Sequence, residues 1–355
     1  MEKKFIKKKN GDGHLEFKFA YLNLSYNKQN SFVGANANHS RKFNTFHSMK
    51  KFKLVLGFIL LLLFVFIIYF SIQFFTNNQE TKEMNAAERK NVGGQFIQLG
   101  DGITHFESGG PDTGKVIVLV HGFSVPYYIW DGTYDSLVQH GFRVVRYSAF
   151  GRGFSDRPAV DYNPAFYRKQ LFDLINALKL KTPLHIMGVS FGGAVVSDFA
   201  VQHPSLIDKI ILVDPVYNFK INKEAAIIRN YKMTVHHEQQ ANGQLEDFKY
   251  PQRFPGWVEK YKVQMQYKGF RHALISTMDH YKGDTILFNY QMLNKLNKKI
   301  LLIWGKEDKT VSFQYSDSLR KKLQVHFFAV DSAGHLPYLE QPLVVNQRII
   351  SFLRE

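Results

Sequence analysis

The sequence predicts an α/β domain whose mostly parallel sheet is covered by helices on both faces, with one transmembrane helix before it. Two observations carry this prediction. Short apolar segments alternate with helical segments after residue 94, which is typical of a parallel sheet covered on both faces. A long uncharged apolar run precedes them, and the alternation is interrupted between residues 216 and 298.

The apolar run extends from Leu54 to Ile72 and contains 19 residues without a charge. A helix of this length spans roughly 30 Å of hydrocarbon. Three lysines stand directly before the run: Lys50, Lys51 and Lys53. Because positive charge stays on the cytoplasmic side, residues 54–75 are predicted to be a signal anchor in the cell membrane, with the following domain extracytoplasmic. A cleaved signal peptide is the alternative, but the run is long and no small-x-small site closely follows it.

Basic residues are concentrated at the N-terminus. The formal net charge is +16, and residues 1–53 hold 12 Lys/Arg against 3 Asp/Glu. This segment is expected to be a basic cytoplasmic tail, in which residues 1–48 are disordered or form an upstream extension that is not normally translated. Such clusters set membrane orientation, so no nucleic-acid partner is expected. The chain has no cysteine, which excludes disulfides, thiolate metal sites and a cysteine nucleophile.

The domain itself is expected to contain eight strands, at residues 95–99, 103–108, 115–120, 142–147, 184–187, 209–213, 299–304 and 325–330. Residues 76–93 are polar and rich in Asn, Glu and Lys, and are expected to be a linker or a continuation of the helix. Residues 216–298 are helical in character and rich in Tyr, Lys and Gln, which predicts a cap over the carboxyl edge of the sheet. Residues 94–215 and 299–355 are then the core.

A Gly-x-Ser-x-Gly sequence centred on Ser190 lies between an apolar strand and a helical run. A serine in such a turn has a strained backbone, and Gly188 and Gly192 leave room for the neighbouring strand and helix. The hydroxyl is then held at the top of the sheet, beside a helix N-terminus. The pentapeptide is weak evidence alone, but its place between strand and helix predicts a nucleophile.

A serine nucleophile needs a base, and the base needs an orienting acid. Asp308 and His335 each follow a predicted strand, so both fall at the same sheet edge as Ser190. The chain order serine, acid, histidine agrees with a strand–turn–helix nucleophile. Asp214 also ends a strand and is the alternative acid.

The segment His121-Gly122-Phe123 follows another predicted strand. The backbone N–H groups of Phe123 and Phe191 are expected to form an oxyanion hole, where each preset donor contributes roughly 10²–10³ in rate. Three aromatic residues after this loop are expected to line the acyl pocket, although ordinary packing also explains them: Tyr127, Tyr128 and Trp130. No cofactor and no metal site are expected, because the cap histidines lack partners at metal-ligand spacing.

These motifs resemble the α/β-hydrolase superfamily, in its cap-bearing serine hydrolase branches, from about residue 95 to 355. The resemblance rests on five ordered motifs: His121-Gly122-Phe123, residues 148–158, residues 188–193, Asp308, and Gly334-His335. It implies a triad of Ser190, Asp308 and His335, because the Gly305-x-x-Asp308 turn is the family's usual position for the acid. Position 148 is Ser where relatives usually carry Asp, and Ser312 stands where many have Pro; neither position is catalytic.

The resemblance further implies a carboxylesterase or lipase that forms an acyl-enzyme intermediate, in the esterase and monoacylglycerol-lipase-like branch. A carbon–carbon-bond hydrolase of the same fold and a catalytically silent surface binding module are the alternatives. Monoacylglycerols or lysolipids are the expected substrates, because the anchor holds the site near the bilayer. The cap supplies apolar residues for such a cleft: Phe254, Trp257, Phe270, Leu274, Ile275 and Phe288.

Overall fold

The computed structural model describes residues 5–9, 15–19, 37–217 and 224–355. The chain divides into two compact units, Met1–Ile68 and Tyr69–Glu355. In the first unit, β1 (Phe5–Lys9) pairs antiparallel with β2 (Leu15–Phe19). The rest of the segment expected to be a disordered tail lies mostly outside the described residues.

One long apolar helix, α1 (Ala37–Asn77), begins in the first unit and ends in the second. Its part from Met49 to Asn77 is long and apolar enough to cross a membrane, with a mean hydropathy of 3.0 in its most apolar window. The side chains at positions 49–69 are all exposed, so no protein core accounts for their apolar character. The helix begins well before residue 54, at Ala37.

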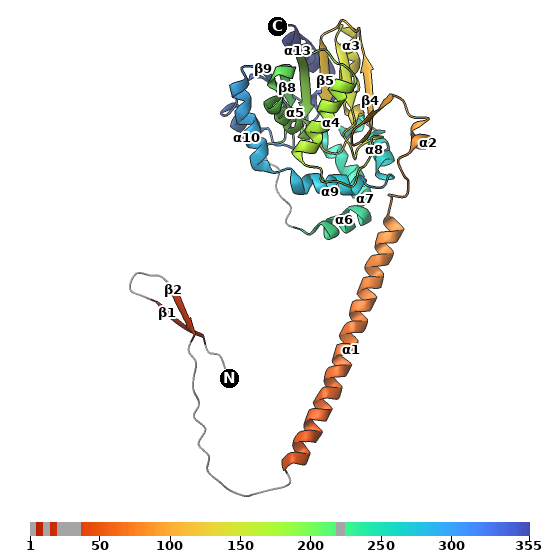
Figure 1. The fold of residues 1–355 in the computed structure, drawn as a ribbon, viewed down its shortest axis with the longest axis vertical. Helices are drawn as coiled ribbons and strands as arrows, with labels where there is room; N and C mark the ends of the chain where they lie inside the picture. Colours follow the sequence, from red (N-terminus) through yellow and green to blue (C-terminus); the bar gives the residue numbers. More distant parts are fainter. Residues whose placement is uncertain (1–4, 10–14, 20–36, 218–223) are drawn as a thin grey trace. The chain divides into compact units, whose positions relative to one another are not determined.

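The eight expected strands form one sheet (Figure 1). From edge to edge they are β10 (His326–Val330), β9 (Lys299–Gly305), β8 (Ile207–Val213), β7 (Leu184–Val189), β5 (Val116–Val120), β6 (Arg143–Tyr147), β4 (Gly102–Gly109) and β3 (Gln95–Leu99). In this spatial order, each strand from β10 through β5 is parallel to the next, so that β6 is the last strand of the parallel part. Strand β4 pairs antiparallel with β6 and β3.

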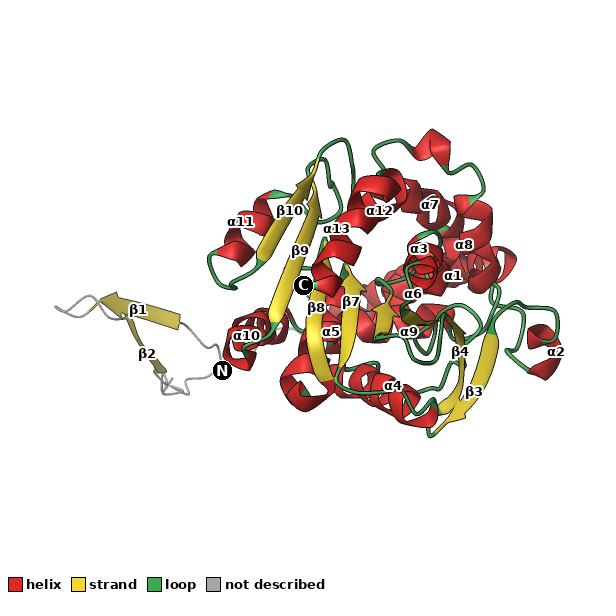
Figure 2. Ribbon diagram, turned by 90° about the horizontal axis from the view of Figure 1, so that it is seen from above, coloured by secondary structure: helices red, strands yellow, loops and turns green. Residues whose placement is uncertain are grey.

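The central strands are buried on both faces, and Figure 2 shows helices on both sides of the sheet. Alternate residues of β5 enter two different cores, Val118 in one and Leu119 in the other. The first core includes α4 (Pro164–Ala177), α5 (Phe191–Gln202), α10 (Gly283–Leu293) and α11 (Gln314–Arg320). The second includes α3 (Thr133–Gln139), α12 (Pro337–Glu340) and α13 (Pro342–Arg354).

The insertion between β8 and β9 is helical, as expected. It contains α6 (Ala226–Val235), α7 (His237–Asn242), α8 (Trp257–Met265) and α9 (Phe270–His280), followed by α10. Helix α10 lies inside the range expected to be cap, but Ile286, Tyr290 and Leu293 are buried in the same core as α5. The end of the insertion therefore covers the sheet.

The polar segment after α1 is attached to the second unit along its length. It contains the short helix α2 (Ala86–Arg89). Lys82 forms a parallel β-bridge with Tyr267, and Arg89 is paired with Asp156. A linker was expected here because the segment is mostly polar, but its polar groups bind backbone groups and charged side chains of the second unit's cap and core.

Candidate active site

Ser190 lies in a sharp turn between β7 and α5, with backbone angles φ 53° and ψ −121°. Such a conformation is costly for a residue with a side chain and persists only where the surroundings impose it. A Cβ atom on Gly188 would lie 2.3 Å from the carbonyl oxygen of Gly192, and one on Gly192 would lie 2.3 Å from that of Val120. The two glycines are therefore required by backbone contacts, and the turn between strand and helix is as expected.

Asp308 and His335 meet at the carboxyl edge of the sheet, after β9 and β10. His335 Nδ1 lies 2.8 Å from Asp308 Oδ2. Because an ionised carboxylate can only accept, Nδ1 carries the proton and Nε2 is left as the basic nitrogen. The other carboxylate oxygen, Oδ1, accepts from the backbone N–H groups of Thr310 and Val311, each at 2.8 Å. These bonds fix the acid, which in turn orients the imidazole.

The basicity of His335 depends on two opposing effects. Burial favours the neutral imidazole, while the charge of Asp308 and its hydrogen bond favour the protonated form. The second effect wins, so the pKa of His335 is raised above its ordinary value. A raised pKa makes Nε2 a stronger base toward a serine hydroxyl.

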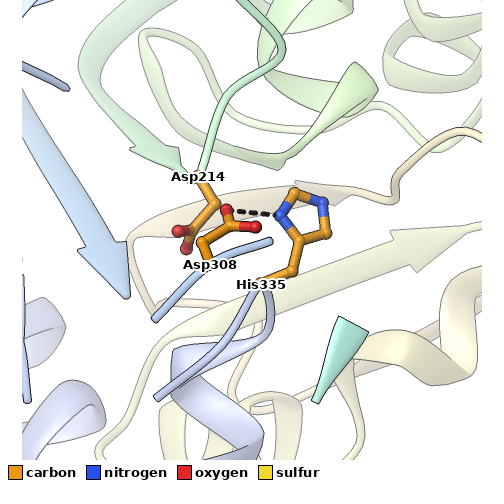
Figure 3. A group of neighbouring side chains, drawn as sticks. All are labelled: Asp214, Asp308 and His335. Atoms are coloured by element: carbon orange, nitrogen blue, oxygen red, sulfur yellow. Dashed lines mark hydrogen bonds and ion pairs between the residues drawn. The ribbon is translucent and has the colours of Figure 1, made fainter. Parts of the chain in front are cut away.

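Asp214 directly follows β8 and lies beside the Asp308–His335 pair (Figure 3). One carboxylate oxygen of Asp214, one of Asp308 and a ring nitrogen of His335 all lie within 4.8 Å of one another. However, Oδ1 of Asp214 accepts from the N–H of Gly305 at 2.9 Å, and the imidazole bonds to Asp308. Burial, and then the charge of Asp308, raise the pKa of Asp214 well above its ordinary range. Of the two carboxyl groups, Asp214 is therefore the one whose charged form is disfavoured, and Asp308 is the one that bonds to the imidazole.

Ser190 and His335 line the same cavity, of about 340 Å³. Its walls mix apolar and polar side chains: Val125, Ile129, Leu336, Gln244, Lys309 and Thr310. The cap contributes residues from the segment 243–247, and the peptide oxygen of Asp247 accepts from the N–H of His335 at 2.7 Å. A larger groove, of about 970 Å³, lies between α3 and α13 and contains none of these catalytic candidates.

The loop expected to hold the oxyanion lies against the nucleophile. A Cβ atom on Gly122 would lie 3.5 Å from Ser190 Cβ. The rings of Phe123 and Phe191 meet edge to face, 6.0 Å apart, and Phe191 is the first residue of α5. The two residues expected to supply the donors are therefore neighbours, one in the loop against Ser190 and one directly after it in the chain.

His121 ties this loop to the neighbouring one. Its Nε2 accepts from the N–H of Ala149 at 2.8 Å, and its Nδ1 donates to the carbonyl of Gly122 at 2.7 Å. Burial lowers the pKa of His121 to about 3, so the ring is neutral. A neutral imidazole has one donor and one acceptor nitrogen, which agrees with these two bonds. Because a peptide unit is planar, holding the Gly122 carbonyl also sets the direction of the Phe123 N–H.

Arg152 is a further residue of this site that sequence reasoning missed. Its buried guanidinium donates to the carbonyl of Phe123 at 3.0 Å and to the hydroxyl of Thr277 in α9 at 3.0 Å. It therefore links the oxyanion loop to the cap. Arg152 lies inside the glycine-rich turn at residues 148–158, and this position is the sequence feature that marks it. In the sequence that turn indicates the fold, whereas the contacts of Arg152 with Phe123 and Thr277 depend on the folded structure.

The aromatic residues expected to line the acyl pocket lie elsewhere. Tyr127 and Tyr128 line a separate cavity of about 260 Å³, and Trp130 is buried and stacked on Tyr338 with ring centroids 4.6 Å apart. Of the 3₁₀ turn Tyr127–Trp130, Ile129 alone is among the residues that line the Ser190 cavity. For Trp130, the alternative role of ordinary core packing is therefore the one that the structure shows.

The cap residues expected to wall the cleft are also absent from the lining of the Ser190 cavity. Five of them are buried in the apolar core or packed against it: Phe254, Trp257, Phe270, Leu274 and Ile275. Phe288 is exposed on α10. These residues support the cap from within, and the segment 243–247 forms its contribution to the cavity.

The model of the alpha/beta hydrolase fold family matches residues 115–342, which is more than half of the chain. The protein belongs to the α/β-hydrolase family. Carboxylesterase YbfK of Bacillus subtilis is 24% identical over 270 residues, covering 73% of this chain and 86% of that protein. Monoacylglycerol lipase ABHD6 of Mus musculus is 24% identical over 264 residues, covering 69% of this chain and 77% of that protein.

An uncharacterized protein of Mycobacterium tuberculosis is 38% identical over 101 residues, but the match spans only 28% of this α/β-hydrolase and 29% of the mycobacterial protein. Solved structures show the same fold over much longer stretches. A thermophilic esterase from Thermogutta terrifontis has a TM-score of 0.63 at 23% identity, covering 73% of this chain and 98% of that one. A meta-cleavage product hydrolase from Pseudomonas fluorescens also has a TM-score of 0.63, at 20% identity, covering 74% and 97%.

Proposed function

We propose that this α/β-hydrolase is a membrane-anchored serine esterase that works through an acyl-enzyme intermediate. One observation carries the proposal: Ser190, in its strained turn, and His335, bonded to Asp308, line the same cavity. A nucleophile, a base and an orienting acid at one cavity are what acyl transfer requires.

In the proposed reaction, Ser190 Oγ attacks the ester carbonyl while His335 Nε2 takes the hydroxyl proton. The N–H groups of Phe123 and Phe191 donate to the negative oxygen of the tetrahedral intermediate. His335 then returns the proton to the leaving alcohol, and the acyl group stays on Ser190. Water, deprotonated by the same imidazole, releases the acid and restores the hydroxyl.

The proposed substrates are esters with an apolar acyl side and a polar alcohol side, such as monoacylglycerols or lysolipids. The mixed walls of the cavity, with Ile129 and Leu336 beside Gln244 and Lys309, support this class. The relatives named as a carboxylesterase and a monoacylglycerol lipase are consistent with it. The proposed anchor is residues 54–75, which lie within the apolar stretch Met49–Asn77 of α1. The hydrolase unit is proposed to be extracytoplasmic, because lysines precede the apolar run.

A panel of nitrophenyl esters from acetate to palmitate, with and without liposomes, tests this function. The full chain should hydrolyse the panel, with kcat/KM rising from acetate toward medium and long chains and rising further with lipid. A steady fall from acetate upward, unaffected by lipid, would contradict the lipid substrate and leave a small-ester esterase. Turnover of a ring-cleavage product with none of the esters would favour the carbon–carbon hydrolase.

A further inference from the structure

The last turns of α1 contact the cap. Residues from Tyr69 onward belong to the same compact unit as the hydrolase core. The ring of Phe70 lies 5.1 Å from that of Tyr231 in α6, and the guanidinium of Arg271 in α9 lies 5.9 Å from the ring centroid of Phe74. Both α1 residues fall inside the apolar stretch Met49–Asn77. The cap therefore lies beside the end of the proposed membrane span.

The segment after α1 is hydrogen-bonded to the cap. The Glu80 carboxylate accepts from the N–H groups of Gly269 and Arg271, at 3.0 and 2.6 Å. The backbone of Lys82 accepts from Lys268 and donates to Gln266, each at 2.9 Å. We call residues 78–89 the strap. Its backbone and carboxylate bonds hold it to the start of α9.

Helix α6, whose Tyr231 contacts Phe70, also carries exposed apolar side chains. Ile227 is 78% exposed and Ile228 is 46% exposed. Positions three and four residues apart share one helix face, so both isoleucines share a face with Tyr231, which contacts Phe70. The opposite side of α6 is buried and polar, where Arg229 pairs with Asp279 of α9 at 2.6 Å.

We propose that α6 lies in the lipid–water interface, with Ile227 and Ile228 inserted among the lipid acyl chains. This inference rests on the membrane anchoring in the proposed function. An exposed isoleucine pair is unfavourable in water, and the same face continues onto Phe70. In the proposed anchoring Phe70 is a residue of the membrane span, so lipid is its neighbour there. Interfacial helices bury their apolar face by about 5–10 Å at this boundary. The occupant of this face is therefore a lipid surface.

The absence of cysteine from the sequence permits a direct test. In this test the full chain with the substitution Ile227→Cys is labelled at position 227 with a polarity-sensitive fluorophore. The labelled protein is then reconstituted in phosphatidylcholine–phosphatidylglycerol vesicles. The control is Leu343→Cys in α13, an apolar side chain that is 86% exposed. Spin-labelled lipids should quench the fluorophore at position 227, and its emission should shift to the blue, whereas position 343 should show neither effect.

Other results would overturn the inference. If lipid quenchers leave the fluorophore at position 227 as bright as the one at position 343, and aqueous iodide quenches it, then position 227 lies in water. One that is shielded from iodide but unquenched by lipid is covered by a protein partner or a second copy. Turnover of a soluble ester on the same samples separates the two proposals: quenching at 227 without turnover sinks the esterase alone, and turnover without quenching sinks the membrane contact alone.

Discussion

Asp308, and not Asp214, holds the imidazole of His335, although the two carboxyl groups lie side by side at the end of the sheet. Two buried carboxylates so close cannot both be charged at low cost. The backbone donors of Thr310 and Val311 stabilise the charge on Asp308. This division of roles gives the first prediction.

Asp308→Asn should lower kcat by about 10²–10⁴, because an amide no longer fixes the imidazole tautomer or stabilises its charge. Asp214→Asn should retain nearly all activity, since the imidazole bonds to Asp308 and an amide oxygen at position 214 can still accept from the N–H of Gly305. The measurement is kcat/KM for a soluble nitrophenyl ester, with circular dichroism as the folding control. A greater loss in Asp214→Asn would show that the acid has been misassigned.

The pH dependence should report His335. Its pKa is raised above the ordinary 6.5, so the imidazole stays protonated, and unable to act as a base, to a higher pH than usual. The acidic limb of kcat/KM should therefore lie above pH 6.5. In Asp308→Asn the residual activity should show this limb at lower pH, because burial then acts without the opposing charge. A limb that does not move between the two proteins would contradict the assignment.

His121→Ala should lower kcat by roughly 10²-fold, the loss expected for one misdirected oxyanion donor. The reason is that its Nδ1–H holds the Gly122 carbonyl and thereby the Phe123 N–H. The acidic limb should stay in place, because the pKa of His121 is about 3 and the ring is neutral throughout the assay range. The matched control is His272→Ala, an exposed cap histidine, which should be unaffected. Equal activity in both variants would remove His121 from the site.

The orientation of the membrane anchor can be tested on cells. Protease added to intact cells or protoplasts should digest the hydrolase unit, because the basic residues before the apolar run favour the cytoplasm. A cytoplasmic marker protein should stay intact in the same samples. Digestion of the hydrolase unit only after lysis would reverse the proposed topology.

The strands and the catalytic candidates could be predicted from sequence because local patterns encode them. Apolar runs mark the buried strands, and Gly188 and Gly192 mark the turn at Ser190, where backbone contacts exclude a side chain. Asp308 and His335 then follow from their positions after β9 and β10. Parallel topology brings such positions to one edge.

The remaining features depend on contacts between distant segments. The strap was expected to be a flexible linker, because its partners are backbone groups at residues 266–271, which no local pattern reveals. The direction of Tyr127 and Tyr128 depends on a 3₁₀ turn, and composition cannot show which side of a loop faces the nucleophile. Likewise, the packing of α10 on α5 depends on where the insertion returns to the sheet.

The identity of the nucleophile is the central claim, and a fluorophosphonate probe tests it most directly. The probe, incubated with the full chain, should leave one adduct, which mass spectrometry of the digested protein places on Ser190. Ser190→Ala should abolish labelling and turnover together, while Ser124→Ala, a serine of the same cavity, should keep both. Labelling that survives in Ser190→Ala, or an adduct on Ser124, would contradict the account.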